Sequence, residues 1–369
     1  MAVSDEPLRA RSEALAAPAW DWGQVRRVLV LRLRSIGDTV LSTPALHCLR
    51  RFLPTARIDV VLEDWVAPLL AASPDVDEVL CLPKRGLAGR ARLVRLLRQR
   101  RYDVAVNLHG GTTATLLAFA AGVPRRIGYR RYQYSALLTH RLPPSTQLWN
   151  QPEVHSVEEQ LALLGGVGVP VTDRPRTRLA VSGAAHAAVL RRLAAAGLAP
   201  ESPVAVLHPG ASLATKRWPA AGFGEVALHL RDQGFSPVAV VGAGEESVRE
   251  ALIAAVPPGA LVVLADLDLA EVVALAALGK VFVGNDSGVA HIAAAVGTPA
   301  VVIFTSSNVL HWRPWASAPS EVVRRPVPCA PCPGYTCGGP VHLACVAGVS
   351  PQAVMAATRR VLGRSTEEA

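Results

Sequence analysis

Four polar segments of this chain carry residues that could do chemistry, and each follows a short apolar run typical of a buried strand. Such placement puts their side chains at the carboxyl ends of strands, the usual binding edge of a parallel sheet. The segments are Arg-Leu-Arg-Ser-Ile-Gly-Asp-Thr at 32–39, His-Pro-Gly-Ala-Ser at 208–212 with Lys216 beyond it, Gly-Ala-Gly-Glu-Glu-Ser at 242–247, and Gly-Asn-Asp-Ser-Gly-Val-Ala-His at 284–291.

The segment at 284–291 predicts an anion site at the start of a helix. Small residues such as Gly288 let the backbone approach a ligand closely. The free N–H groups of a first helical turn also favour a phosphate. His291 lies one turn beyond Ser287 and could face the same ligand. The alternative is a plain helix cap formed by Asp286 or Ser287.

The loop that ends at Lys216 predicts a contact with a diphosphate. Lys216 stands just before a helix entrance at Trp218–Pro219, and its ammonium is a compact point charge. The hydroxyls of Ser212 and Thr215 lie near it in the sequence. The alternative is an ordinary surface lysine.

Two carboxylates follow the strand pattern at 238–241. Glu245 or Glu246 could accept hydrogen bonds from ribose hydroxyls, as carboxylates at strand ends often do. The match to a dinucleotide fingerprint is weak, because Ser247 stands where the third glycine belongs. Either glutamate could instead favour the N-terminus of the next helix.

Asp38 predicts a general base. It opens a helix after the first strand, at the mouth of a crossover connection. A carboxylate at a helix N-terminus is expected to be ionised at neutral pH, so it could accept a proton. The alternative is a helix-capping role for Asp38.

The charge of the chain is unevenly spread. The 369 residues carry a formal charge of +9, yet Lys84 to Arg141 contain thirteen Lys or Arg and a single acid, Asp103. This block predicts an anionic partner, such as a phosphorylated substrate, an anionic lipid or a nucleic acid. The alternative is a solvated helix face.

Four of the six cysteines cluster near the C-terminus, with the spacing Cys329-x₂-Cys332-x₄-Cys337-x₇-Cys345. Four thiolates could hold zinc or an iron–sulfur cluster, although the spacing is irregular for a zinc ribbon. A disulfide and four free thiols packed in a loop are the alternatives.

Targeting signals are not expected in this sequence. Residues 1–22 lack the apolar core of a signal peptide. The uncharged stretch Ser287–Trp312 is broken by Gly297, Thr298 and Pro299, so we expect a helix, a turn and a strand there. We therefore expect a cytoplasmic protein that could touch a membrane surface.

Strand and helix patterns alternate along the chain, which predicts an α/β fold with doubly wound parallel sheets. Candidate strands are Val28–Leu33, Ile58–Leu62, Asp103–Leu108, Val204–Leu207, Val238–Val241, Leu261–Leu264, Val281–Val283 and Ala300–Phe304. Candidate helix signals include a capping box at Asp268 and Glu271, a C′ glycine at Gly234 and an N-cap at Ser350.

The polar, proline-containing stretch at 168–182 predicts a linker between two halves. We therefore expect a mobile N-terminal arm at 1–24, a first domain at 25–175, a second domain at 176–348 and a C-terminal helix at 349–369. The second domain includes the Cys-rich loop 326–348.

The polar segments, taken together, resemble glycosyltransferase family 9, the heptosyltransferases of the lipopolysaccharide inner core. The likeness runs in order from about Val28 to Leu362, and it includes His109-Gly110, Arg125–Tyr129 and the Cys-rich tail. It implies a GT-B fold, with two Rossmann-like domains facing across a cleft. The domain at 25–175 would bind the acceptor and the domain at 176–348 the nucleotide-sugar donor, and the C-terminal helix would cross back onto the first domain.

The resemblance also assigns roles to residues. It makes Asp38 the catalytic base and Lys216 a ligand of the donor diphosphate. It assigns the ribose carboxylate to Glu245 or Glu246 without deciding between them. Ala211 stands where related sequences often carry a hydroxyl, so Ser212 and Thr215 are the nearby candidates. The donor pocket would also contain Asp286, Ser287, Gly288 and His291.

The implied reaction is an inverting, metal-independent transfer of a heptose or related sugar from a nucleotide-diphosphate donor, ADP-heptose in the first instance. No cofactor is required. Asp266 and Asp268 imitate a metal-binding Asp-x-Asp pair, but Asp268 already caps a helix. The implied acceptor is a phosphorylated lipopolysaccharide core on the inner membrane face, and Arg125, Arg126 and Arg130 are the predicted acceptor-binding residues.

Three other functions compete with this one. A Rossmann-type dehydrogenase would need an intact Gly-x-Gly-x-x-Gly after a strand, which is not found. A nucleic-acid-binding protein would need aromatics among the basic residues, and only Tyr129, Tyr132 and Tyr134 form such a cluster. A glycosyltransferase for another sugar or acceptor is the serious alternative.

Overall fold

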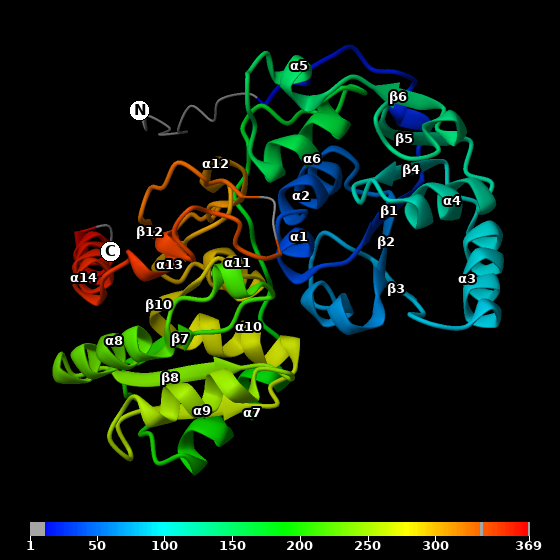
Figure 1. Ribbon diagram of the computed structural model, residues 1–369. Helices are drawn as coiled ribbons and strands as arrows, with labels where there is room; N and C mark the ends of the chain where they lie inside the picture. Colours follow the sequence, from blue (N-terminus) through cyan, green and yellow to red (C-terminus); the bar gives the residue numbers. More distant parts are fainter. Residues whose placement is uncertain (1–11, 333–334, 368–369) are drawn as a thin grey trace, which may run out of the picture. The chain divides into compact units, whose positions relative to one another are not determined.

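The computed structural model describes residues 12–332 and 335–367 (Figure 1). The chain divides into two compact units, which are considered separately. Unit 1 comprises Met1–Leu33, Pro44–Leu62 and Asp75–Pro175, and unit 2 comprises Arg34–Thr43, Glu63–Pro74 and Arg176–Ala369. The second unit thus resumes at the predicted linker, but it also takes two short segments from the first half of the chain.

Unit 1 is built on a six-stranded sheet with the order β3-β2-β1-β4-β5-β6. Its strands are β1 (Arg27–Leu33), β2 (Arg57–Glu63), β3 (Glu78–Leu82), β4 (Val104–Asn107), β5 (Arg125–Tyr129) and β6 (His140–Leu142). Its helices are η1 (Trp22–Gln24), α2 (Thr43–Phe52), α3 (Leu87–Arg100), α4 (Thr112–Ala120), η3 (Ser135–Leu137), α5 (Ser145–Trp149) and α6 (Ser156–Gly165).

Part of the predicted N-terminal arm is packed onto unit 1. The backbone N–H of Leu15 donates to the carbonyl of Gly165, and the indole Nε1 of Trp22 donates to the carbonyl of Val167 at 2.9 Å. Trp22 is buried. The sequence predicts a mobile arm at 1–24; residues 1–11 of it lie outside the described part of the chain.

Unit 2 is built on a second six-stranded sheet, with the order β12-β11-β10-β7-β8-β9 and parallel pairing between neighbours. Its strands are β7 (Val204–His208), β8 (Ser236–Val241), β9 (Val262–Ala265), β10 (Gly279–Asn285), β11 (Ala300–Phe304) and β12 (Ser320–Arg324). Its helices are α1 (Ile36–Val40), η2 (Asp64–Leu69), α7 (Gly183–Ala195), η4 (Ala214–Lys216), α8 (Ala220–Asp232), α9 (Glu246–Ala254), α10 (Leu269–Leu278), α11 (Gly288–Ala295), α12 (Val309–Trp312), α13 (Ala344–Ala347) and α14 (Pro351–Glu367).

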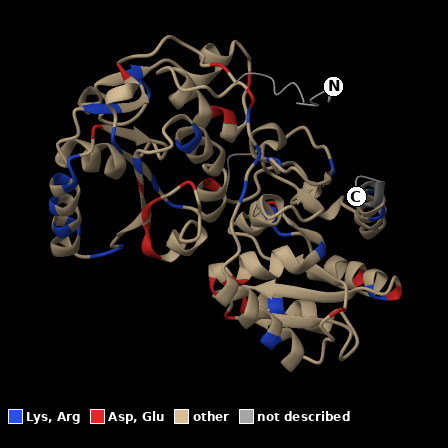
Figure 2. Ribbon diagram, turned by 180° about the vertical axis from the view of Figure 1, so that it is seen from behind, with Lys and Arg blue, Asp and Glu red and all other residues tan. Residues whose placement is uncertain are grey.

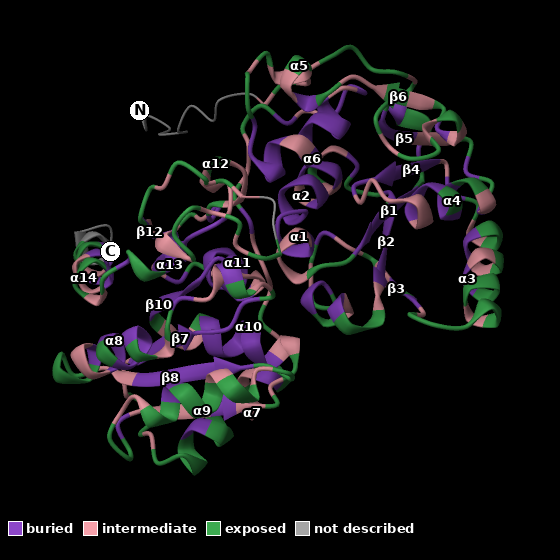
Figure 3. Cartoon of the chain, in the orientation of Figure 1, coloured by how far each residue is buried: buried purple, intermediate pink, exposed green. Residues whose placement is uncertain are grey.

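Local sequence signals explain several helix ends. Asp268 and Glu271 form the predicted capping box at the start of α10. Gly234 follows α8 with a φ of +85°, a left-handed conformation that glycine adopts without strain. Ser350 precedes α14, and its Oγ accepts a hydrogen bond from the N–H of Ala353. The strands of both sheets are largely buried, as Figure 3 shows, which confirms the predicted α/β class.

The C-terminal helix packs on unit 2. Val354, Ala357 and Val361 of α14 are fully buried in a core that also contains residues of α8, β10, β11 and β12. Its apolar face is buried against the second sheet. Packing of this helix on the first domain, which the resemblance implies, stays a prediction.

Candidate active site

The loops after β7 and β10 are joined by one buried amide. Asn285, at the end of β10, donates from Nδ2 to the carbonyl of Pro209 at 2.8 Å. Its Oδ1 accepts the backbone N–H of Trp218 at 3.1 Å. Because β7 and β10 pair in parallel, both loops leave the same edge of the sheet. Asn285 therefore fixes both ends of the loop that carries Lys216.

Lys216 and Asp286 form an ion pair. Lys216 Nζ lies 2.8 Å from Asp286 Oδ2. The lysine side chain is 23% exposed and the aspartate side chain 6%. An ammonium held this way at a sheet edge is accessible to a ligand and oriented before the ligand arrives. A diphosphate could take the place of the carboxylate as its partner.

Thr215 anchors this loop to the residues that follow β11. Thr305 Oγ1 donates to the Thr215 carbonyl at 2.6 Å, and Ser306 Oγ donates to Thr215 Oγ1 at 3.3 Å. Thr215 is buried, whereas Ser212 is exposed. Ser212 therefore has the freer hydroxyl of the two predicted donor contacts.

His208 lies under the start of α11. Its Nδ1 lies 3.1 Å from Ser287 Oγ, in hydrogen-bonding contact. Burial lowers the pKa of His208, while the charge of Glu245 acts in the opposite direction. His208 is therefore neutral at pH 7. The sequence patterns did not single it out, because a histidine ending an apolar strand resembles a plain strand residue.

Asp38 belongs to the same structural unit as Lys216 and Asp286. The short helix α1 contacts α11: a Cβ at Gly37 would lie 2.8 Å from His291 Cδ2, and one at Gly288 would lie 2.6 Å from Ile36 Cβ. Any side chain at either glycine would force the two helices apart. Ser35 Oγ donates to Asp38 Oδ2 at 2.8 Å.

His291 of α11 is a buried histidine that interacts electrostatically with Asp286, Asp38 and Lys216. Burial lowers its pKa; the charges of Asp286 and Asp38 act to raise it, and the charge of Lys216 acts to lower it. Its Nδ1 is buried and has no hydrogen-bond partner in the described structure. The charges of three predicted site residues from distant parts of the sequence thus act on one buried imidazole.

The side chains of the two candidate glutamates, Glu245 and Glu246, make different contacts. Glu245 turns back over the loop after β7: a Cβ at Gly210 would lie 2.0 Å from its Oε1, and its Oε2 accepts the N–H of Gly242 at 2.9 Å. Glu246 accepts the N–H of Gly244 at 3.0 Å, a local contact at the start of α9. Of the two, Glu245 faces the loop that leads to Lys216.

Comparison with known proteins identifies the family. The family model of glycosyltransferase family 9 (heptosyltransferase) matches residues 90–340. This chain belongs to glycosyltransferase family 9. It is 29% identical over 297 residues to lipopolysaccharide heptosyltransferase 2 of Escherichia coli, covering 76% of this chain and 83% of that protein. It is 28% identical to lipooligosaccharide heptosyltransferase 2 of Haemophilus influenzae, covering 75% and 82%.

A solved structure, that of E. coli ADP-heptose lipopolysaccharide heptosyltransferase II, matches this family 9 enzyme with a TM-score of 0.77. The match has 27% identity and covers 93% of this chain and all of that one. The chain is therefore a glycosyltransferase with the GT-B type of fold, as the sequence predicts.

The predicted acceptor residues of the enzyme lie in unit 1 and serve structural contacts there. Arg126 donates from Nε to the Leu137 carbonyl at 2.7 Å, and Arg130 donates from Nε to the Arg141 carbonyl at 3.1 Å. The guanidinium of Arg125 lies 5.7 Å from the ring centre of Trp20. These contacts fix β5 and its neighbours, and an acceptor role for these arginines stays a prediction.

The rest of the basic block divides into two parts. Arg100 pairs with buried Asp59 at 2.6 Å, and Tyr102 and Arg57 also donate to that carboxylate at 2.6 and 3.0 Å. These residues stabilise unit 1. The ribbon of α3 is coloured blue at several positions in Figure 2, which marks its other arginines; Arg90, Arg92 and Arg95 are exposed there.

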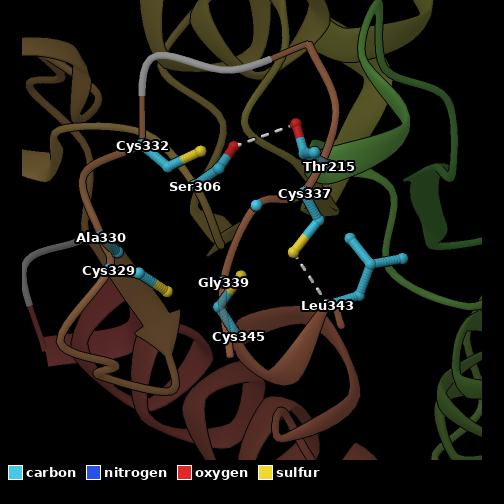
Figure 4. Close-up of a pocket in the computed structure, with 10 residues that line it drawn as sticks. Thr215, Ser306, Cys329, Ala330, Cys332, Cys337, Gly339, Leu343 and Cys345 are labelled. Atoms are coloured by element: carbon cyan, nitrogen blue, oxygen red, sulfur yellow. Dashed lines mark hydrogen bonds between the residues drawn. The ribbon is translucent and has the colours of Figure 1, made fainter. Parts of the chain in front are cut away.

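The cysteine loop of the enzyme forms its own cavity, of about 220 Å³ (Figure 4). The six cysteines all lie in the described part of the chain, and none of them forms a disulfide. The N–H groups of Leu343 and Gly339 lower the pKa of Cys337, whereas burial raises that of Cys345. The thiols that line the cavity are those of Cys329, Cys332, Cys337 and Cys345.

This loop does not form a ready metal site. Among the described residues, which omit 333–334 of this loop, no group of three or more Cys, His, Asp or Glu is arranged to hold a metal ion. The iron-containing glycosyltransferase TibC of E. coli shares the fold at 15% identity, with a TM-score of 0.54. The iron of TibC is a property of that protein and supports no part of the mechanism of this chain. A metal at the cysteines of this chain stays a prediction.

Within the described residues, none of the enzyme's helices combines the length and apolar character needed to cross a bilayer.

Proposed function

We propose that this family 9 glycosyltransferase moves a heptose from a nucleotide-diphosphate donor, ADP-heptose, to a lipopolysaccharide core acceptor, with inversion at the anomeric carbon. Its relatives named above are heptosyltransferases of lipopolysaccharide and lipooligosaccharide. The observation that carries the proposal is the grouping of Lys216, Asp286 and Asp38 around buried His291 within unit 2.

Asp38 acts as the general base. An acceptor hydroxyl is a weak nucleophile until its proton is removed. The proton passes to a carboxylate oxygen of Asp38 while the hydroxyl oxygen bonds to the anomeric carbon. The bond from that carbon to the donor diphosphate breaks, and its electron pair leaves with the diphosphate. Ser35 Oγ, which donates to Asp38 Oδ2, orients the carboxylate for this transfer.

Lys216 and the start of α11 stabilise the departing diphosphate. Charge grows on the diphosphate as the sugar leaves, and donors that are already in place stabilise it without reorganisation. Lys216 supplies a full positive charge, and the first N–H groups of α11 supply partial ones. Asp286 holds the lysine at 2.8 Å until the donor binds. The proposed chemistry needs no metal, so we expect activity to survive EDTA.

Glu245 recognises the ribose of the donor. It faces the loop after β7 that leads to Lys216, whereas Glu246 accepts the N–H of nearby Gly244. A ribose on the same nucleotide as the bound diphosphate must lie near that loop. The hydroxyls of a ribose are matched by carboxylate acceptors at strand ends.

The exposed cations of α3 make a reversible contact with an anionic membrane surface, where a lipid-anchored acceptor is found. Each cation near such a surface contributes about 1 kcal/mol. Leu87, at the first turn of α3, is 86% exposed and could add an apolar contact.

A donor screen tests the proposed function. Thermal shifts are measured with ADP-, UDP-, GDP- and CDP-sugars, followed by transfer assays with a purified core acceptor. We expect ADP-heptose to give the largest shift and to be the productive donor. A larger shift and turnover with another nucleotide sugar would assign a glycosyltransferase for a different sugar, and an absolute Mg²⁺ requirement would contradict the proposed donor site.

A further inference from the structure

A second cavity in unit 2, of about 500 Å³, has a basic lining. It lies at the carboxyl ends of β11 and β12, beside α12 and the start of the cysteine loop. Three arginines line it, and none of its described lining residues is acidic. The polar lining residues are Thr305, Ser307, Asn308, Arg313, Arg324 and Arg325.

The backbone fixes two of these arginines. Arg324 ends β12 and pairs in register with Phe304 of β11, so it stands at the edge from which the donor loops also leave. The stem of Arg325 packs against Gly348: a Cβ there would lie 2.6 Å from Arg325 Cγ. Gly348 therefore leaves room for Arg325 to approach the chain before α14.

Two of the three arginines keep charges that the described residues do not neutralise. Arg324 and Arg325 form no ion pair or hydrogen bond with the described residues. The Oγ of Ser307 is buried and has no hydrogen-bond partner there. A buried hydroxyl without a partner costs free energy, and gathered like charges repel one another. An anionic ligand would relieve both costs.

The chemistry of the lining selects a phosphoryl group among anions. Guanidinium groups match the geometry of phosphate oxygens with paired hydrogen bonds. A hydroxyl such as that of Ser307 can donate to a further oxygen. The volume lies within the range of small-molecule sites and can hold a sugar as well as its phosphate.

The cavity adjoins the proposed donor site. Thr305 lines it, and Thr305 Oγ1 donates to the carbonyl of Thr215, the residue before Lys216. A ligand in the cavity therefore lies next to the loop that would hold the donor diphosphate. We propose that this cavity binds a phosphomonoester carried by the acceptor sugar; its assignment to the acceptor rests on the proposed function.

The first test measures binding alone. Glucose 6-phosphate and glucose are titrated against the full chain in a Lys216→Ala background, which removes the proposed donor cation. We expect the phosphate ester to bind and glucose not to bind. Arg324→Gln with Arg325→Gln should weaken binding at least tenfold. The matched control, Arg191→Gln with Arg231→Gln, removes two exposed arginines of the same unit and should change it less than twofold. Equal losses in the two pairs, or no binding, would overturn the proposal.

The second test addresses the acceptor. Transfer is measured with the lipid-anchored core acceptor and with its delipidated oligosaccharide, each before and after phosphatase treatment. We expect Arg324→Gln with Arg325→Gln to raise KM at least fivefold for both phosphorylated forms and to leave kcat and the dephosphorylated forms unchanged. Phosphate binding without this KM effect would overturn the acceptor assignment. Phosphate binding in a chain that transfers no heptose would count against the proposed function while leaving the cavity's ligand class intact.

Discussion

At the scale of single residues, the proposed site depends on buried residues that hold its loops in place, and no sequence pattern assigns them this role. Lys216, Asp286 and Asp38 could be proposed from their types and their positions after strands. Asn285 and His208 could not, because each ends an apolar strand and carries no spacing signal. Gly37 and Gly288 are explained only by the packing of α1 on α11. Tertiary contact, rather than local pattern, gives these residues their roles.

Asp38→Asn removes the proposed base and keeps the shape of the side chain. Because general-base help is worth about 10²- to 10⁴-fold, we expect kcat to fall by about that factor while ADP affinity stays within twofold. Initial rates and nucleotide titrations measure the two. Asp232→Asn, at the exposed end of α8, is the matched control. Turnover within tenfold of the parent enzyme would remove Asp38 as the base.

Single substitutions of Glu245 and Glu246 test which of the two carboxylates binds the donor ribose. Glu245→Gln should weaken ADP binding about tenfold, because the carboxylate facing the β7 loop is lost. Glu246→Gln changes the same type of residue one position away and should alter it less than twofold. Calorimetric titration with ADP measures both, and the reverse order of effects would assign the ribose to Glu246.

The buried imidazoles predict how stability depends on pH. Burial lowers the folded-state pKa of His208 and His291. Between these values and about 6.5, the unfolded chain binds more protons than the folded one, so the free energy of unfolding falls as pH falls. Each pKa unit of difference contributes about 1.4 kcal/mol.

His208→Asn should flatten this slope in urea unfolding measured from pH 7.5 to 5, because the buried imidazole of His208 no longer contributes to it. His291 and His140, whose pKa values burial also lowers, should still contribute. A variant with the slope of the parent enzyme would show that His208 is not the group responsible.

At the scale of elements, the sequence predicted the strands that lie at the centre of each sheet. Ala300–Phe304 has its predicted bounds, and Val204–Leu207 is one residue short. The strands it missed are β3, β5, β6 and β12, which lie toward or at the sheet edges. Edge strands bury fewer residues, so they carry weaker apolar runs; β12 shows only one buried residue of its five.

The α3 surface predicts a salt-dependent association with vesicles. Replacing Arg90, Arg92 and Arg95 with Gln removes three exposed cations of α3. At about 1 kcal/mol each, their loss should weaken partition onto anionic vesicles roughly 100-fold in low salt, measured by flotation. The parent enzyme should be released in high salt because exposed charges are screened.

A matched control for α3 replaces Arg191, Arg231 and Arg249 of unit 2 with Gln, which gives the same change in net charge. It should keep most of the vesicle binding. Equal binding of the parent enzyme to neutral and anionic vesicles would contradict an electrostatic contact.

At the scale of the whole molecule, the chain builds two sheets but assembles the proposed donor site and base within one unit. The predicted boundary near residue 176 coincides with the main division. What the sequence could not show is that Arg34–Thr43 and Glu63–Pro74 join the second unit. Strand C-termini and helix starts are local features, whereas the sheet on which a short helix packs depends on contacts far along the chain.

This division predicts that stability and nucleotide binding can be separated. Asp59 is fully buried in unit 1 and receives hydrogen bonds from Arg57, Arg100 and Tyr102. Asp59→Asn removes one of the two carboxylates with which Arg57 and Arg100 pair; both stay paired with Glu78 and keep access to water. We expect a loss of about 2–3 kcal/mol in unfolding free energy, less than for a fully buried pair.

ADP affinity should stay within twofold in Asp59→Asn at temperatures where the variant is folded, because every proposed donor residue lies in unit 2. Urea unfolding and calorimetric titration measure the two quantities, with Asp232→Asn as the unit 2 counterpart that should change neither. A parallel loss of stability and ADP affinity would mean that the donor site depends on the integrity of the first sheet. The base, the diphosphate contacts and the ribose carboxylate would then not form an independent assembly.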